Sequence, residues 1–179
     1  MASNTKCTII QAYADLITQK NIDKITVKDV VEVCGITRQT FYYHFQDLLD
    51  VIEWGLRQTT EHAVQQGLQA DTMEEALYIF LSAADRNRQL GRKILNSQKK
   101  NQICDMIFHS IQNWLFAMFK ERNQNTAYPV HELDFALHFY SYAIAGSLYD
   151  VISDDASDLD FVTHQIVELM DPVVSQLKL

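Results

Sequence analysis

Residues 26–45 constrain the fold more than any other stretch, because they predict two short helices separated by one tight turn. Thr26 can cap the first helix, with Asp29 three residues later, and Gly35 is placed to end it. Apolar residues recur at helical spacing between these limits: Val27, Val30, Val31 and Cys34. Thr37 can then cap a second helix. The pattern predicts a helix-turn-helix.

The second helix of this pair has two faces of different chemistry. Phe41 and Phe45 stand four residues apart and are expected to bury against Ile36. Arg38 and Tyr42, also four apart, lie on another face. Arginine pairs with guanine edges, glutamine pairs with adenine, and hydroxyl groups reach phosphates. We therefore expect contacts to double-stranded DNA from Thr26, Thr37, Arg38, Gln39, Thr40, Tyr42, Tyr43 and His44. The alternative is the ordinary polar surface of a helical hairpin.

The order of residues 37–45, followed by Asp47 and residues 50–52, resembles the recognition helix and the next helix start of the TetR (tetracycline-repressor) family of bacterial transcription regulators. The resemblance is specific from about Ile9 to Trp54 and is only compositional beyond. It implies a three-helix head that binds DNA and a helical body that binds a small-molecule effector and dimerises.

The resemblance is strongest to the dihydroxyacetone-kinase-type regulators of that family. Residues 38–42, then 44–46 and a later tryptophan, Trp54, are the ones that carry it. The chain also departs from the family pattern. Many relatives have a lysine just after the cap of the fourth helix, whereas Leu48 follows Asp47 here, so the resemblance does not extend to one phosphate contact.

The composition predicts an all-α globular protein. The chain has 179 residues, 47% of them hydrophobic and 21% charged, with five glycines and two prolines. Alternating strand patterns bounded by turn signals do not occur in the sequence. We expect an N-terminal three-helix helix-turn-helix domain at residues 1–46 and a helical effector-binding and dimerisation domain at residues 47–179.

The acidic charge is concentrated in the expected body. The net charge is −8, but residues 1–46 hold five Lys and Arg against four Asp and Glu, which gives +1. A nearly neutral head can bind DNA, with weak non-specific affinity and dependence on positioned contacts.

The cysteines and the apolar runs predict a cytoplasmic protein. Cys7, Cys34 and Cys104 are odd in number, widely spaced and embedded in apolar helical patterns, which argues against disulfides or a zinc site. The sequence shows neither a signal peptide nor a membrane span. We expect no association with a membrane.

Two later segments, 101–122 and 133–149, are apolar on more than one face. Such helices need cover on both sides, and a body this small is expected to obtain it from a second copy as a homodimer. The body has more bulky side chains with polar ends than packing between its helices requires. They are the candidates for an effector pocket: Phe80, Phe108, Trp114, Met118, His138, Tyr140 and Tyr142.

Other groups of residues are weaker candidates for a metal, anion or catalytic site. His131, Asp134 and His138 share a helix face and could present two imidazoles and a carboxylate to a metal, but a fourth ligand is not evident, so a polar edge is the preferred interpretation. The basic residues between 86 and 100 fit either an anion site or a solvated surface around a short helix, and we assign them no role. Catalytic motifs are absent from the sequence, so we expect no enzyme and no cofactor.

Three hypotheses therefore stand. The first is a ligand-responsive transcription regulator, expected to be a repressor, that binds a pseudo-palindromic operator as a homodimer. The second is a co-regulator or activator of the same fold that acts through a protein partner. The third is an enzyme or ligand carrier on a helical scaffold. The exposed residues of the second short helix favour the first. The operator, the effector and the direction of regulation are not encoded in any pattern of the sequence.

Overall fold

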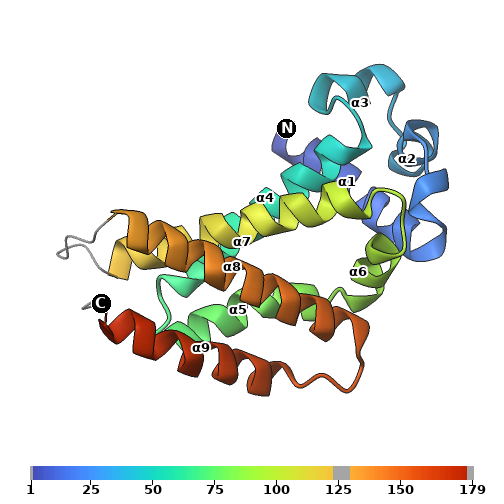
Figure 1. The fold of residues 1–179 in the computed structure, drawn as a ribbon. Helices are drawn as coiled ribbons and strands as arrows, with labels where there is room; N and C mark the ends of the chain where they lie inside the picture. The colour runs from blue at the N-terminus through green and yellow to red at the C-terminus, as the bar shows by residue number, and fades with distance from the viewer. Residues whose placement is uncertain (1, 123–129, 177–179) are drawn as a thin grey trace. The chain divides into compact units, whose positions relative to one another are not determined.

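The computed structural model describes residues 2–122 and 130–176, with side chains described within 4–120 and 133–170. All regular structure in these residues is helical, which confirms the predicted fold class. The helices follow one another in the order shown in Figure 1: α1 (Ala2–Gln19), the 3-10 turn η1 (Ile22–Lys24), α2 (Val27–Cys34), α3 (Arg38–His44), α4 (Leu48–Gly67), α5 (Met73–Asp85), α6 (Arg88–Leu95), α7 (Lys100–Arg122), α8 (Val130–Ser153) and α9 (Leu159–Gln176).

The chain divides into two compact units. The first unit combines Met1–Arg57 with Gln89–Met106, and the second combines Gln58–Arg88 with Ile107–Leu179. The predicted head lies within the first unit, to which the structure adds α6 and the start of α7. The chain passes between the units three times: within α4, at the first residue of α6 and within α7.

The first unit has a core built on α1. One face of this helix is buried because its apolar residues recur every three or four positions, and α1 packs against α2, which packs against α3. The buried side chains in this unit are Ile9, Ala12, Tyr13, Leu16, Ile17, Ile22, Ile25, Val30, Val31, Phe41, Phe45, Leu48, Val51 and Ile103. The Tyr13 hydroxyl has no hydrogen-bond partner among the described residues, and burial, with smaller contributions from Asp23 and Asp47, raises the pKa of Tyr13 to about 12.

The second unit is a bundle in which α5, α8 and α9 pack against one another. Its buried apolar side chains include Leu77, Leu81, Ile111, Trp114, Leu115, Met118, Tyr140, Ile144, Leu148, Val151, Ile166 and Met170. Arg88 joins two ends of this unit, since its guanidinium pairs with Asp85 and donates to the carbonyls of Asp154 (2.7 Å) and Ser157 (3.1 Å).

Side-chain caps open α4 and α5. The Asp47 carboxylate accepts the backbone N–H groups of Leu49 (2.7 Å) and Asp50 (2.9 Å), and the Thr72 hydroxyl accepts from Glu75 N (3.1 Å). These side chains satisfy amide groups that the first turn of a helix leaves without partners. None of the helices in residues 2–122 and 130–176 has the length and apolar character that a membrane crossing requires.

Candidate nucleic-acid interface

The turn between α2 and α3 has the geometry that the sequence predicts. Gly35 adopts the left-handed conformation, with φ 66° and ψ 30°. The Gly35 N–H reaches the Glu32 carbonyl at 3.4 Å, and the Ile36 N–H donates to the Val31 carbonyl at 3.1 Å. This pair of bonds is a Schellman motif, which satisfies the last carbonyls of α2. The chain can therefore reverse direction within two residues and begin α3 at Arg38.

The short α3 is fixed on one side and exposed on the other. Phe41 and Phe45 are almost completely buried, with 0% and 2% of their surface exposed. Arg38 and Gln39 are exposed, and Tyr42 and Tyr43 expose 57% and 82% of their surface. Seven residues make less than two turns, so burial of the phenylalanines, rather than intrinsic helix propensity, holds this helix. The exposed face is a rigid row of hydrogen-bonding groups.

Two threonines at the start of α3 bind each other. The Thr37 hydroxyl accepts the Thr40 backbone N–H at 3.1 Å, and the two hydroxyl oxygens lie 2.9 Å apart. Thr37 is thus the N-cap that the sequence predicts. One of the two hydroxyl protons forms the hydrogen bond between Thr37 and Thr40. His44 ends the helix, with its ring edge-on to Tyr43 at 5.0 Å between centroids.

A capping box and an ion pair connect α2 to the end of α1. The Asp29 carboxylate accepts from the Thr26 backbone N–H at 2.7 Å and lies 2.8 Å from Lys20 Nζ. The Thr26 hydroxyl donates to the same carboxylate at 2.6 Å and accepts from Asp29 N at 3.3 Å. The Lys20 hydrogen bond, followed by those from Thr26, holds the pKa of Asp29 well below its usual value of 3.8. Asp29 therefore stays ionised in the folded protein under mildly acidic conditions.

Lys6 contributes a contact that the sequence patterns did not reveal. Its ammonium lies over two rings, 5.0 Å from the centroid of Phe45 and 5.4 Å from that of Trp54. The rings meet edge to face at 6.3 Å. This cation–π arrangement joins the start of α1 to the end of α3 and to α4. A lysine near the chain start carries no local signal of such a role.

The first unit is more basic than the first 46 residues alone. With Gln89–Met106 included, it holds ten Lys and Arg against eight Asp and Glu, a balance of +2, while the second unit holds five against fifteen, a balance of −10. The acidity of the chain thus resides in the unit without the helix-turn-helix. This distribution favours approach of the first unit to a polyanion.

The candidate effector residues form two groups of ring contacts in the second unit. Phe80 stacks on the fully buried Trp114 with centroids 4.9 Å apart. Phe108 lies 4.5 Å from Tyr142 and 6.1 Å from His138, both of which are exposed. The remaining two candidates are buried: Met118, and Tyr140, whose hydroxyl donates to the Leu169 carbonyl at 3.3 Å. Their convergence on a single pocket remains a prediction.

The second unit has a cavity of about 280 Å³ between α4 and α5. It is lined by Gln58, Thr59, His62, Ala63, Gln66, Ile79, Ala83 and Arg86. This lining is mostly polar and includes none of the predicted aromatic candidates. Isolated Gln and His residues on an amphipathic helix give no signal of a cavity, which arises only when the neighbouring helix is in place.

The residues considered for a metal are only partly described. Asp134 and His138 are exposed on α8, and the side chain of His131 lies outside the described residues. His138 Nε2 lies 3.2 Å from the Gln112 amide. Across the described part of the chain, no three His, Cys, Asp or Glu side chains come together in the manner of a metal-ligand set.

The helix-turn-helix unit and the all-helical body were compared with known protein families. Two family models match the chain: "Bacterial regulatory proteins, tetR family" over residues 9–48, and "Transcriptional regulator C-terminal region" over residues 71–171. The second match alone spans more than half of the chain. The chain belongs to the TetR family of DNA-binding transcription regulators, which are not enzymes.

Similar proteins include dihydroxyacetone-kinase-type regulators, the group that residues 38–46 and Trp54 resemble. The HTH-type dhaKLM operon transcriptional activator DhaS of Lactococcus lactis subsp. lactis (strain IL1403) is 23% identical over 177 residues, covering 98% of this chain and 91% of the relative. A solved structure of the dihydroxyacetone kinase operon activator DhaS has a TM-score of 0.73 at 22% identity and covers 97% and 96% of the two chains. The TetR transcriptional regulator from Streptococcus agalactiae 2603V has a TM-score of 0.67 at 18% identity, with 94% of each chain covered.

Proposed function

We propose that the protein is a ligand-responsive transcription regulator that uses α3 to read an operator in the major groove. The observation that carries this proposal is the exposed row of Arg38, Gln39 and Tyr42 on a helix anchored by two buried phenylalanines. A helix fixed in this way presents its polar groups without first having to order them. Rigid presentation of bidentate donors is what base recognition requires.

The proposed contacts divide into base readout and backbone positioning. Arg38 and Gln39 read base edges, because both are exposed in the first turn of α3, which enters the groove in helix-turn-helix proteins. The remaining proposed DNA-binding residues meet phosphates: Thr26, Thr37, Thr40, Tyr42, Tyr43 and His44. Thr37 and Thr40 share one internal hydroxyl bond, so the other hydroxyl proton of this pair can point to a phosphate oxygen.

The test begins with selection of bound fragments from the source genome, followed by affinity measurements on the selected site and its single-base-pair variants. Arg38→Ala should weaken binding by about 1–3 kcal/mol and relax preference at one base pair. Tyr42→Phe should weaken all sites alike. Lys24→Ala is the control, since this exposed lysine of η1 is outside the proposed contacts. Equal loss at every site for Arg38→Ala and Tyr42→Phe would refute the division.

Homodimerisation is proposed through α8 and α9, which lie side by side in the second unit (Figure 1). Their exposed large apolar side chains support this: Phe135, Phe139, Tyr142, Tyr149, Phe161 and Leu169. Soluble monomers rarely expose so many on neighbouring elements. Gly146, exposed in the middle of α8, would allow close approach of a second helix. The operator would then be a pseudo-palindrome that mirrors the two-fold axis.

Sedimentation of the full chain at micromolar concentration tests the dimer. Phe139→Glu should shift the protein toward monomer, whereas Leu68→Glu, which changes an exposed apolar residue just after α4, should leave the dimer intact. A soluble monomer of the unmodified chain would overturn the proposal.

A small-molecule effector site is proposed in the second unit. Two buried polar atoms support it, Trp114 Nε1 and Thr163 Oγ1, which have no hydrogen-bond partner among the described residues. Unpartnered buried donors are costly, and a ligand that accepts from them recovers that cost. Thermal-shift screening of metabolites, repeated with Trp114→Phe, tests the site. A ligand that stabilises the protein but leaves operator affinity unchanged would remove the regulatory role.

The direction of regulation separates two candidates. Repression by blocking a promoter is the first, and activation through a protein partner is the second. The similar regulator DhaS is an operon activator, which favours the second candidate. Transcription of a promoter carrying the selected operator, measured with and without the protein, distinguishes the two by its sign.

A further inference from the structure

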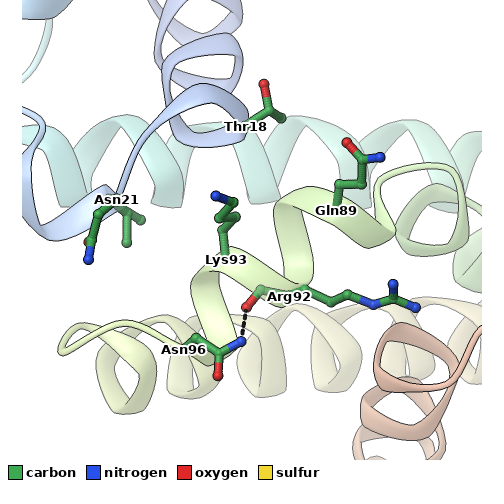
Figure 2. Close-up of a pocket in the computed structure, with 7 residues that line it drawn as sticks. Thr18, Asn21, Gln89, Arg92, Lys93 and Asn96 are labelled. Carbon is green, nitrogen blue, oxygen red and sulfur yellow. Dashed lines mark hydrogen bonds between the residues drawn. The ribbon is translucent and has the colours of Figure 1, made fainter.

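The first unit contains a partly open cavity that the helix-turn-helix does not use. Its volume is about 440 Å³, and its polar side chains are largely exposed along an open rim. The end of α1 and η1 supply one wall, and α6 supplies the other, as Figure 2 shows. The lining residues are Thr18, Asn21, Ile22, Gln89, Arg92, Lys93 and Asn96. All belong to the first unit.

Several polar groups of this lining already have an internal partner. The Thr18 hydroxyl donates to the Asp15 carbonyl at 2.7 Å, and Asn21 Oδ1 accepts from the Asp23 N–H at 2.8 Å. Asn96 Nδ2 donates to the Arg92 carbonyl at 2.9 Å, the bond drawn in Figure 2. Because the Asn21 carbonyl oxygen accepts that bond, the groups that Asn21 can offer to an anion are its two amide N–H donors.

Lys93 and Gln89 extend from α6 toward the end of α1 (Figure 2). Lys93 brings three N–H donors and a positive charge, and Gln89 brings an amide that can donate or accept. The Arg92 guanidinium points away from Asn21 in the same view, so Lys93 is the residue that would meet a ligand charge. With Ile22 as the apolar part of the wall, the cavity combines one cation, several donors and an apolar surface.

The charge around the cavity favours an anion. Residues 89–106 hold four Lys and Arg and a single acid, Asp105, in a chain whose net charge is −8. The nearby Asp23 carboxylate keeps its negative charge, and both of its oxygens accept the Gln98 N–H, at 3.1 and 3.2 Å. Charge-assisted bonds from an ammonium to an oxyanion are stronger than neutral ones.

We propose that this cavity binds a small phosphorylated metabolite, with the phosphate at Lys93 and the Asn21 amide, and with a polar, hydroxyl-bearing remainder at Gln89 and Asn96. The donor-rich lining suits the phosphate oxygens, and the volume suits a sugar phosphate. Such a ligand joins α6 to the end of α1, the helix that braces α2 through Lys20 and Asp29. It acts in parallel with the Asp23–Gln98 contact, which already holds the segment after α6 against η1.

Calorimetric titration of the full chain with inorganic phosphate and with glucose 6-phosphate tests the proposal, with glucose as the uncharged control and sodium chloride to match ionic strength. Both phosphates should bind saturably, with dissociation constants at or below about 1 mM, and glucose should bind at least about tenfold more weakly. Because the titration contains no DNA, its result is independent of operator recognition.

Two matched variants locate the site. Lys93→Gln should weaken phosphate binding about tenfold or more, because it removes a charge-assisted bond. Lys24→Gln removes an exposed lysine of η1 that does not line the cavity, and its binding should stay within about twofold of the unmodified chain. Thermal unfolding without ligand verifies that both variants fold. Absence of saturable binding by both phosphates, or equal weakening by the two variants, would overturn the proposal.

Discussion

Gly35 offers a direct test of the physical account of the helix-turn-helix. At φ 66°, an L-residue with a Cβ places that atom too close to the following carbonyl oxygen, at a cost of about 1–2 kcal/mol. A Cβ built on Gly35 meets nothing within 4 Å, so Gly35→Ala adds backbone strain without a steric clash. Alanine also restricts the unfolded chain, which returns about 0.4–1 kcal/mol. The net expected loss of stability is about 1 kcal/mol.

Gly55→Ala is the matched control in the same unit. Gly55 lies inside α4, and a Cβ there meets Ile10 Cγ2 at 3.7 Å, an ordinary van der Waals contact. Among the described glycines, Gly35 is the one with a positive φ, so the substitution at Gly55 adds no such strain. It should stabilise the protein by about 0.5–1 kcal/mol. The two Gly→Ala changes are thus expected to have opposite signs.

Urea unfolding at one fixed protein concentration measures both changes, since stability of an oligomer depends on that concentration. Gly35→Asn supplies a third point, because asparagine tolerates the left-handed region and should lose less than alanine. A Gly35→Ala protein as stable as the unmodified chain would refute the need for the left-handed turn. A loss above about 3 kcal/mol would show that more than one residue's strain is involved.

Three further changes test the local interactions around the interface. Thr37→Ala should cost about 1 kcal/mol because the Thr40 N–H loses its acceptor, whereas Thr37→Ser should stay close to the unmodified chain in a denaturant titration. Asp29→Asn should destabilise the protein at pH 7, and the difference should shrink as pH falls below about 4. Because the pKa of Asp29 is lower in the folded protein than in the unfolded chain, its carboxylate stabilises the fold at pH values above the unfolded-state pKa. This stabilisation is lost as Asp29 takes up a proton. A difference in stability that does not change with pH would contradict the role of Lys20. Tyr13→Phe should leave the calorimetric midpoint of thermal unfolding unchanged or raise it, because the Tyr13 hydroxyl is buried without a hydrogen-bond partner among the described residues. A loss of stability above about 1 kcal/mol would reveal such a partner.

The local architecture was predictable from sequence because its causes are local. The caps Thr26, Thr37 and Asp47 bind amides two or three residues ahead, and Gly35 is required by its own backbone angle. Phe41 and Phe45 fall on the buried face because 3.6 residues make one turn. Each of these features is marked by fewer than six consecutive residues, so the linear pattern predicts it, and packing of the first unit then buries Phe41 and Phe45.

The features that required the tertiary structure join residues far apart in the chain. Asn21 and Lys93 line one cavity although they are far apart in the sequence, and no periodicity links them. The bulk of the aromatic residues in the body predicts one pocket, but their ring contacts form a Phe80–Trp114 stack and a separate cluster around Phe108. Sequence by itself determined where helices begin, which faces are apolar and that α3 presents a polar row. Only the packing of helices decided which distant side chains share a cavity, because that depends on interhelical geometry, to which every buried side chain contributes.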